Sequence, residues 1–215
     1  MSNIKHSSAT SEQYTPPEIV EPSRKLMGGI TLDPASDEMG NKLIKAKRIY
    51  TYKDNGLQQN WRAKSVFLNP PGGRIGPDDR PVEYGGRSSA KAWWFKLADA
   101  YASRVVKTAV FVGFSIELLQ TTQLNNSEDI PLPIHFPICI PRRRIAFYTR
   151  NVVRTQGKKA GELIDPSQPK GVLVLGDSPT HANVLIYLPF DWSRLEETNF
   201  KKLFEQLGEC VWPSI

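Results

Sequence analysis

The sequence predicts a single α/β domain in which strands alternate with helices around a mostly parallel sheet. Short apolar runs with Val, Ile, Leu and Phe lie at 30–32, 66–68, 109–114 and 184–188, and stretches with helical periodicity separate several of them. A chain of 215 residues can bury a substantial core, and it contains no internal repeat. Because such alternation favours a sheet with helices on both faces, we expect residues 14–215 to form one domain.

The N-terminal end is expected to be a tail followed by a helix. Residues 1–13 are polar and Ser-rich and show no periodicity, which is typical of disorder. A helix is expected over residues 18–27, with Thr15 as its N-cap and Pro16 at its first position. Two glycines at 28–29 end this helix, and the first strand follows at once.

The middle of the chain is expected to hold two strands, a loop and a helix. The second strand is expected within 43–52 and the third at 66–68. Residues 72–89 are rich in Gly, Pro and charged side chains and exceed an ordinary connection, which indicates a mobile loop beside a site. An amphipathic helix is expected over 90–106, with Trp94 on its apolar face.

The C-terminal half is expected to add strands to the same sheet. The apolar run at 109–114 leads into a helix that ends near Leu119, and a Pro-rich surface connection fills 121–141. Further strands are expected at 144–148, 172–175 and 184–188.

Composition restricts the function classes. The balance of 28 Lys and Arg against 22 Asp and Glu gives a net charge of +6. The pI is about 9.3, which favours a polyanionic partner. Two cysteines and three scattered histidines offer neither a disulfide framework nor a metal site. The polar start does not read as a signal peptide, and no apolar stretch could span a bilayer, so we expect a cytoplasmic protein without membrane or metal partners.

The most informative segment is the end of the third strand, where Asn69, Pro70 and Pro71 follow an apolar run. Proline fixes its own φ and supplies no N–H, so its carbonyl is held in place while no donor competes nearby. An Asn carbonyl beside a rigid backbone carbonyl makes two acceptors that can point at one –NH₂ group. The lone pair of a nucleobase amine is delocalised, and two acceptors on its hydrogens favour a pyramidal, nucleophilic nitrogen. The segment is equally compatible with a plain Pro-rich turn after a strand.

This segment has companions in a recognisable order. Upstream stand Tyr14-Thr15-Pro16-Pro17-Glu18, then Ile30-Thr31-Leu32-Asp33-Pro34-Ala35, then Asp54-Asn55-Gly56-Leu57. With this arrangement the sequence resembles the S-adenosylmethionine-dependent amino-methyltransferases, and more narrowly the phage-type DNA N-6-adenine methyltransferase family. The resemblance is clear from Tyr14 to about Lys96 and continues more weakly to about Pro189. It implies a Rossmann-like methyltransferase sheet, with S-adenosyl-L-methionine as cofactor and DNA as partner.

The resemblance assigns the cofactor site to three segments. Asp33 and Ala35 match the motif after the first strand, whose carboxylate helps to anchor the ammonium of the cofactor. Thr15 and Pro16 match the segment that closes over the methionine carboxylate, where a hydroxyl and free amides suit an anion. Asp54 matches the acidic turn that accepts from the adenine amino group. Each segment alone could be an ordinary turn or helix start. Their positions relative to one another favour the interpretation as a cofactor site.

The sequence departs from the family's pattern at two places, one in the expected cofactor site and one in the expected site for the target base. The usual motif continues with Cys-Gly-x-Gly, whereas residues 36–40 here read Ser-Asp-Glu-Met-Gly, without the glycines that let backbone approach a cofactor. The Asn-Pro-Pro segment matches the catalytic motif, but the aromatic residue that commonly follows it and stacks on a flipped base is replaced by Gly72. The nearest candidates for that stacking role are Tyr84, Trp93 and Trp94.

A basic run is the expected DNA-binding surface. It contains seven cations in eighteen positions and no acidic residue: Arg142, Arg143, Arg144, Arg150, Arg154, Lys158 and Lys159. Such a run suits the phosphate backbone, although a solvated face can have the same composition. Alternation along a strand would put Arg142 and Arg144 on one face and Arg143 on the other.

Together with the resemblance, these residues predict an adenine-specific DNA methyltransferase of a bacterial or phage-infected cytoplasm. The sequence leaves open whether this methylation serves restriction-modification or regulation. Two alternatives stay open. One is a methyltransferase of the same fold that acts on cytosine or on a protein Gln. The other is a catalytically silent nucleic-acid-binding protein that retains the fold. The sequence does not specify the recognition sequence, the strandedness of the substrate or the oligomeric state.

Overall fold

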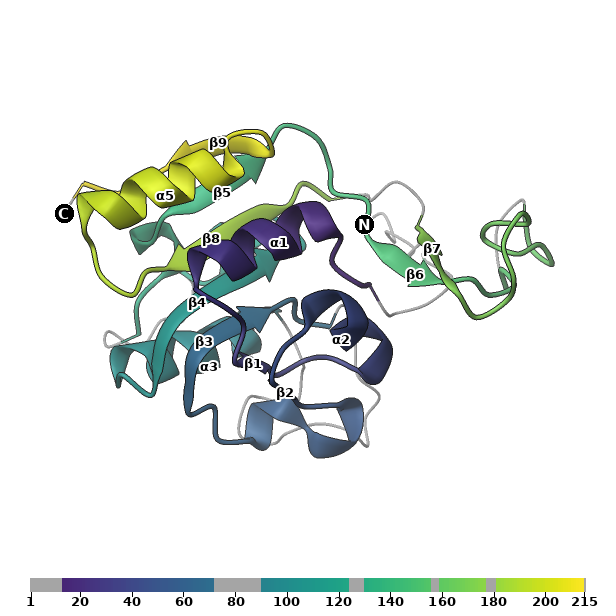
Figure 1. Ribbon diagram of the computed structural model, residues 1–215, viewed down its shortest axis with the longest axis horizontal. Helices are drawn as coiled ribbons and strands as arrows, with labels where there is room; N and C mark the ends of the chain where they lie inside the picture. Colours follow the sequence, from purple (N-terminus) through teal and green to yellow (C-terminus); the bar gives the residue numbers. More distant parts are fainter. Residues whose placement is uncertain (1–12, 72–89, 124–129, 156–158, 177–180, 215) are drawn as a thin grey trace.

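Figure 1 shows the computed structural model of the chain, which describes residues 13–71, 90–123, 130–155, 159–176 and 181–214. The expected loop at 72–89 and residues 1–12 of the expected tail lie outside these ranges. None of the helices in the described ranges combines the length and the apolarity that crossing a bilayer requires.

Seven strands of the described chain form one mixed sheet in the order β2-β1-β3-β4-β8-β5-β9. Their bounds are β1 Leu32–Asp33, β2 Arg48–Ile49, β3 Ala63–Leu68, β4 Val106–Gly113, β5 Ile138–Pro141, β8 Val184–Leu188 and β9 Gly208–Val211. Strands β2, β1, β3 and β4 pair in parallel, whereas β8 is antiparallel to β4 and to β5, and β9 is antiparallel to β5. We call β2-β1-β3-β4 the parallel half and β8-β5-β9 the antiparallel half. The expectation of a mostly parallel sheet holds for the first half, and the sheet as a whole is mixed.

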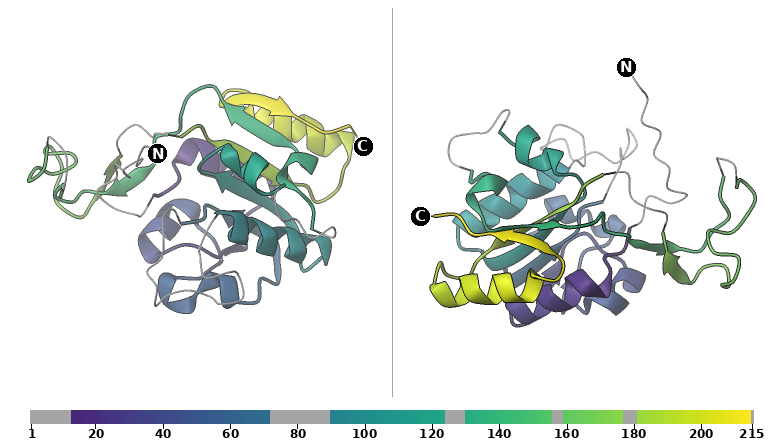
Figure 2. Two further views of the ribbon diagram at one scale, coloured as in Figure 1. Left: turned by 180° about the vertical axis from the view of Figure 1, so that it is seen from behind. Right: turned by 90° about the horizontal axis from the view of Figure 1, so that it is seen from above.

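Helices cover both faces of this sheet (Figures 1 and 2). Their bounds are α1 Pro17–Leu26, α2 Glu38–Ile44, α3 Ala90–Ala102, α4 Glu117–Thr121 and α5 Arg194–Phe204. Helices α1, α2 and α5 share one apolar cluster with Phe67 of β3, whereas α3 and α4 share the other with Val66 and Leu68. Side chains that follow one another along a strand point to opposite faces, so β3 supplies both cores.

The start of α1 differs from the expected one. Its N-cap is Pro16 and its first helical residue is Pro17, so Thr15 does not cap the helix. The expected cap is wrong by one residue because the fixed φ of proline suits either position at a helix start. The helix expected over 90–106 is also too long, since Val106 already begins β4.

Local side-chain caps begin two helices that the sequence analysis did not predict. Asp37 precedes α2, and its Oδ1 accepts from the Gly40 N–H at 2.6 Å. Ser193 precedes α5, and its hydroxyl accepts from the Glu196 N–H at 3.2 Å. Because α2 extends to Ile44, the strand expected within 43–52 is shorter than that range.

The expected surface connection at 121–141 is partly wrong. Strand β5 occupies its end, and Phe136 is buried against the rings of Trp94 and Tyr101. The expected strand at 144–148 is wrong except for its last residue, because 144–147 have no regular structure. Buried and more exposed residues alternate here as they would in a strand, although the segment pairs with no strand of the described chain. This alternation explains the strand-like sequence pattern.

A second, two-stranded sheet joins β6 (Tyr148–Arg150) to β7 (Leu173–Leu175) in antiparallel register. We call the described residues between 148 and 175 the arm. The arm extends away from the seven-stranded sheet in all three views (Figures 1 and 2). Buried Asn151 organises it, because its amide donates to the Asp165 and Gln168 carbonyls and its Oδ1 accepts from the Asp165 N–H.

Candidate functional site

The candidate site lies at the carboxyl ends of the neighbouring strands β1 and β3. Asp33 is the last residue of β1, and Asn69 follows β3 directly. Leu32 of β1 is in register with Val66 of β3, so the two strands end at one edge of the sheet. Ligands of open α/β sheets bind outside this edge. The Asp-Pro-Ala and Asn-Pro-Pro segments therefore meet at one edge of the sheet.

Residues 13–16, which we call the strap, connect the ends of both strands. The amide Nδ2 of Asn69 donates to the Gln13 carbonyl at 2.8 Å. Tyr14 reaches the segment after β1, where its hydroxyl donates to Asp37. Gln13 was expected in a disordered tail, and this expectation is wrong because its carbonyl is engaged at the site.

The Asn69 amide is fixed in one orientation by the strap. With Nδ2 bonded to the Gln13 carbonyl, Oδ1 is the acceptor that stays available, and it receives no hydrogen bond from the residues that the structure describes. Pro70 is buried and Pro71 is exposed, so the backbone after Asn69 runs from the core to the surface. The amide oxygen of Asn69 thus stays available next to the rigid Pro70 backbone, and the convergence of the two acceptors on one amine stays a prediction.

Thr15 contributes a polar atom with unused capacity. Its side chain is 2% exposed, and its buried Oγ1 has no hydrogen-bond partner among the described residues. A buried hydroxyl without a partner costs about 1–3 kcal/mol, and native proteins rarely leave one unless a ligand or water satisfies it. Pro16, the next strap residue, is buried as well.

Asp33 is a buried carboxyl group at the end of β1. Burial raises the pKa of Asp33 to about 7, even though the Ala35 N–H donates to its Oδ1 at 3.0 Å and stabilises the charged form. The ion pairs found within the described ranges do not include it. A bound cation would therefore meet a carboxylate that has no protein counter-ion in the described chain.

The Asp54 turn is brought against the Asp33 segment by a glycine. A Cβ at Gly56 would lie 1.9 Å from the Pro34 carbonyl oxygen, so only glycine permits this approach. Asp54 itself is exposed, and its Oδ2 accepts from both the N–H and the hydroxyl of Thr51 at 2.7 Å. These hydrogen bonds lower the pKa of Asp54. The turn thus lies beside the site, while the carboxylate of Asp54 caps its own short helix.

The two tryptophans proposed as base platforms are both buried. Trp94 packs edge-on against Phe111, and its Nε1 donates to the Pro131 carbonyl. Trp93 stacks on Trp61 with ring centroids 5.8 Å apart, and its ring also approaches Gly56. Both are core residues, and the Trp93 ring packs against the turn that contains Asp54 and Gly56. The other candidate, Tyr84, lies outside the described ranges, as does Gly72.

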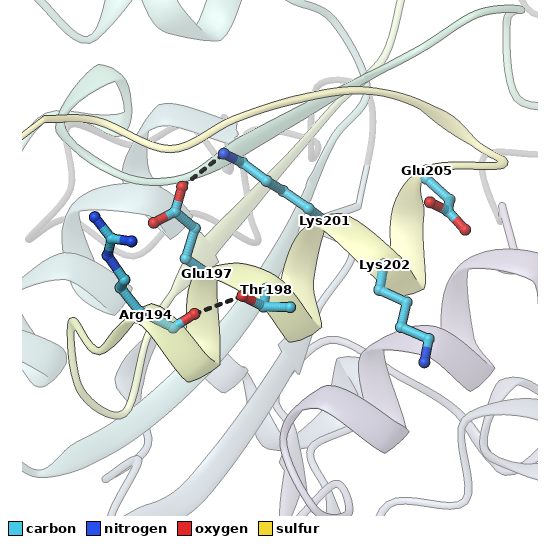
Figure 3. A pocket seen from close by; sticks show the side chains of 6 residues that line it. All are labelled: Arg194, Glu197, Thr198, Lys201, Lys202 and Glu205. Carbon is cyan, nitrogen blue, oxygen red and sulfur yellow. Dashed lines mark hydrogen bonds and ion pairs between the residues drawn. The ribbon is translucent and has the colours of Figure 1, made fainter.

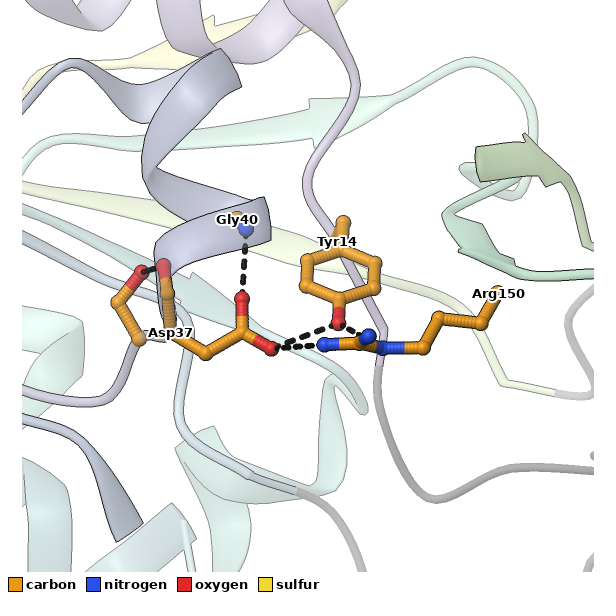
Figure 4. A network of polar contacts seen from close by, with 5 residues as sticks. Tyr14, Asp37, Gly40 and Arg150 are labelled. Atoms are coloured by element: carbon orange, nitrogen blue, oxygen red, sulfur yellow. Dashed lines mark hydrogen bonds and ion pairs between the residues drawn. The ribbon is translucent and has the colours of Figure 1, made fainter. Parts of the chain in front are cut away.

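A polar network joins the strap, the loop after β1 and the arm (Figure 4). Arg150 donates from Nη2 to Asp37 Oδ2 at 2.8 Å and from Nε to the Tyr14 hydroxyl at 3.0 Å. Tyr14 in turn donates to the same Asp37 oxygen at 2.9 Å. The guanidinium of Arg150, expected on DNA, is therefore engaged within the protein.

The other members of the basic run lie on the surface. Arg142, Arg143 and Arg144 are exposed and follow β5 in a bend, so the strand alternation expected for them does not apply. Arg154 donates to the Ile164 carbonyl at 3.3 Å, and Lys159 is exposed in the arm. Lys158 lies outside the described ranges.

A shallow depression on α5 contains none of the predicted site residues (Figure 3). It is lined by Arg194, Glu197, Thr198, Lys201, Lys202 and Glu205. Lys201 pairs with Glu197 at 2.6 Å one turn away, which is an ordinary surface contact of one helix. In the described ranges, no group of three or more His, Cys, Asp or Glu side chains is placed to hold a metal ion.

Sequence reasoning missed Gln13 and Asp37 as parts of this site. Gln13 acts through its backbone carbonyl, which leaves no signal in residue type. Asp37 could have been found, because an Asp three residues before Gly40 is a helix start signal. Searches of family models, of curated proteins and of solved structures found no match to this chain.

Proposed function

We propose that this protein is an S-adenosyl-L-methionine-dependent methyltransferase that acts on the exocyclic amino group of adenine in DNA, built on a Rossmann-like sheet. The single observation that carries the proposal is the orientation of Asn69. Its Nδ2 is bonded to the Gln13 carbonyl of the strap, which leaves Oδ1 as the available acceptor at the sheet edge where Asp33 ends β1.

Asn69 and Pro70 are the groups that would hold the target amine. An Asn oxygen and a proline carbonyl can accept both hydrogens of an –NH₂ group, which favours a pyramidal nitrogen with an available lone pair. Pro71 has no N–H and so removes a donor that would compete for these acceptors. The proton that leaves the amine after attack would pass to water or to these acceptors, and no general base is needed before the transfer.

The residues at the strand ends suit the cofactor. Asp33 is a buried carboxyl group without a cationic partner in the described chain, and the ammonium of S-adenosylmethionine would supply one. The buried Thr15 hydroxyl has no hydrogen-bond partner within the described chain, and it lies two residues before α1, so it could donate to the carboxylate of the cofactor. The Ala35 N–H already bonds to Asp33 and so fixes the carboxyl group. When bound, the cofactor supplies a sulfonium-activated methyl group.

Asp54 is proposed at the rim of this cofactor site. The close contact between Gly56 and the Pro34 carbonyl places its turn beside the Asp33 segment. Oδ2 of Asp54 serves Thr51, which leaves Oδ1 as the oxygen that could accept from the adenine amino group.

DNA contact is proposed for the exposed basic residues of the bend after β5, namely Arg142, Arg143 and Arg144. Arginine binds phosphate oxygens by a rigid fork of donors, and three adjacent arginines give a strong local positive charge. Arg150 is engaged with Asp37 and does not belong to this group.

The direct test is incubation of the purified protein with unmethylated DNA and methyl-labelled S-adenosylmethionine, followed by digestion and nucleoside analysis. The expected product is N6-methyladenine, and it should be absent from the Asn69→Ala variant. Label in cytosine would indicate the cytosine alternative, and label in protein acceptors would indicate the Gln alternative. Salt-dependent DNA binding without any transfer or cofactor binding would indicate the catalytically silent alternative.

A further inference from the structure

Arg150 belongs to the arm, yet its guanidinium donates to Tyr14 and Asp37 at the mouth of the candidate site. We propose that Arg150 is a positioning residue, which holds the strap across the strand ends and thereby sets the cofactor site. The inference rests on the proposed function. It reverses the expectation that Arg150 contacts DNA phosphates.

The three residues of the network form a closed triangle. Arg150 donates to Asp37 and to Tyr14, and Tyr14 donates to Asp37, with donor–acceptor distances of 2.8, 3.0 and 2.9 Å. Asp37 Oδ1 is bonded to the Gly40 N–H at the start of α2. Both carboxylate oxygens of Asp37 are thereby used. Although partial burial by itself raises the pKa of Asp37, the hydrogen bonds from Gly40, Tyr14 and Arg150 outweigh it and lower this pKa.

The packing of Tyr14 restricts the strap further. A Cβ at Gly40 would lie 3.0 Å from the Tyr14 ring, so the ring rests on the first turn of α2. The Tyr14 N–H donates to the Tyr148 carbonyl at 2.8 Å, and the Tyr148 N–H donates back at 2.9 Å. The strap is therefore held from two sides, by α2 and by β6.

The strap residues on either side of Tyr14 are the ones that the proposed site uses. Gln13 orients the Asn69 amide, and Thr15 carries the buried hydroxyl without a partner. Gln13 and Thr15 are joined directly to Tyr14 in the chain, so a displacement of Tyr14 would move both of them. Arg150 thus acts on Asn69 and on Thr15 through Tyr14, without touching either in the resolved hydrogen bonds.

The chemistry of arginine is needed for this arrangement. Two different nitrogens of one planar guanidinium serve two acceptors, Asp37 and the Tyr14 hydroxyl. A lysine would keep the charge beside Asp37 but would lack the fixed fork that reaches both acceptors. The side chain of Arg150 is 37% exposed, so the ion pair alone is screened and the hydrogen-bond geometry carries the effect.

The test compares Arg150→Gln with Arg154→Gln, a matched change of another arginine in the arm. S-adenosylmethionine binding is measured by titration calorimetry, and DNA affinity is measured across a range of salt. Arg150→Gln should weaken cofactor binding about tenfold, while the slope of log DNA affinity against log salt stays at the wild-type value. Arg154→Gln should leave cofactor binding unchanged, and Arg150→Lys should recover part of the loss.

A double-mutant cycle with Tyr14→Phe sharpens the test. Because Arg150 is proposed to act through the Tyr14 hydroxyl, the effects of Arg150→Gln and Tyr14→Phe on cofactor affinity should be clearly less than additive. Full additivity would overturn the proposal. A reduced salt slope of DNA affinity with unchanged cofactor affinity would also overturn the proposal, because it would indicate that Arg150 contacts DNA phosphates.

Hydrogen exchange separates failure of this inference from failure of the proposed function. Arg150→Gln should accelerate exchange of the Tyr14 and Tyr148 amide hydrogens about tenfold in the protein without ligand, and Arg154→Gln should not. If wild-type protein does not bind S-adenosylmethionine, the proposed function fails, while accelerated exchange still supports the role of Arg150 in holding the strap. Unchanged exchange overturns that role whatever the cofactor result.

Discussion

The parallel and antiparallel halves of the sheet each have an asparagine at the same edge, and the two amides are used differently. Asn69 follows β3 in the parallel half, and Asn183 precedes β8 beyond the carboxyl end of β4. Asn183 bonds at both ends, because Oδ1 accepts from the Ile145 N–H and Nδ2 donates to the Phe114 carbonyl, each at 2.9 Å. Asn69 bonds through Nδ2 alone within the described chain.

This difference indicates where along the shared edge of the sheet a ligand-binding site can form. In the antiparallel half both the oxygen and the nitrogen of the amide are engaged in joining two chain segments. In the parallel half Asn69 Oδ1, Thr15 Oγ1 and the Asp33 carboxyl group retain capacity that the described protein does not satisfy. Buried polar groups without partners destabilise a fold, and a ligand that supplies the partners would explain why they are present.

The largest effect is expected for Asn69→Ala. This change removes the oriented acceptor for the target amine, so methyl transfer should fall by at least about 100-fold, which corresponds to about 3 kcal/mol of transition-state stabilisation. Cofactor affinity should stay within a few fold. The measurement is single-turnover transfer of labelled methyl to DNA together with calorimetric cofactor binding.

The matched control is Asn183→Ala. If both asparagine variants lose methyl transfer alike, the proposed difference between the two amides is wrong. Asn183→Ala should retain methyl transfer at temperatures where it is folded. Retained activity in Asn69→Ala, or a selective loss in Asn183→Ala, would contradict the distinction between the two amides.

The second effect concerns Asp33→Asn, which should weaken S-adenosylmethionine binding by about 10- to 100-fold, because a charge-assisted contact is worth about 1.5–3 kcal/mol. The pKa of about 7 against an ordinary value of 3.8 means that the folded protein binds an extra proton between about pH 4 and 7. Its free energy of unfolding should therefore fall as pH rises through this window, and the fall should be absent in Asp33→Asn.

Cofactor binding should show the opposite trend in wild-type protein. A bound ammonium favours ionised Asp33, so affinity should rise with pH up to about 7 and then level off. Calorimetry at several pH values checks this. A pH-independent affinity equal in wild type and Asp33→Asn would assign Asp33 to an ordinary strand-end turn.

The third effect is structural and belongs to the antiparallel half. Asn183→Ala should lower the free energy of unfolding by about 1–3 kcal/mol, because the Ile145 N–H and the Phe114 carbonyl lose their partner in the interior. Chemical denaturation measures this loss. Asn69→Ala should cost less, since only the Gln13 carbonyl of the strap loses a described bond.

The smallest effect is expected for replacement of Arg142, Arg143 and Arg144 by Gln. If the bend contacts phosphates, the slope of log DNA affinity against log salt should decrease by roughly 0.9 for each lost contact. All three side chains are exposed, so strand alternation does not limit the number of contacts. Transfer at saturating DNA should change much less than binding. An unchanged slope would assign the bend to solvent.

The sequence predicted the parallel half well because its signals are local. Apolar runs that lead into Asp33 and Asn69 mark the two strands, although their register was not predicted. The end of the third strand could also be interpreted chemically, since proline restricts its own backbone. Strand β8 was predicted with its bounds, although its antiparallel direction was not.

The remaining features depend on tertiary contacts that residue type does not encode. The strap could not be predicted, because Gln13 uses its backbone and because Tyr14 depends on Arg150, far along the chain. The segment before the arm resembled a strand of the main sheet, since buried Ile145 and Phe147 alternate with more exposed residues. The two tryptophans were proposed as a surface for a base, yet tertiary packing places both in the core.

The strap also determines when the site can be completed during synthesis. The contact between Tyr14 and Arg150 spans 136 positions and cannot form until Arg150 has been synthesised. The contact of Gln13 with Asn69 spans only 56 positions. Contacts of such long sequence separation form late in folding because loop closure must precede them. A ribosome-bound chain that has emerged only to β4 would have Asp33, Asn69 and the Gln13 contact, but its strap would lack the anchor that Arg150 gives to Tyr14. Truncated translation products should therefore lack the finished site even where the parallel strands have already formed.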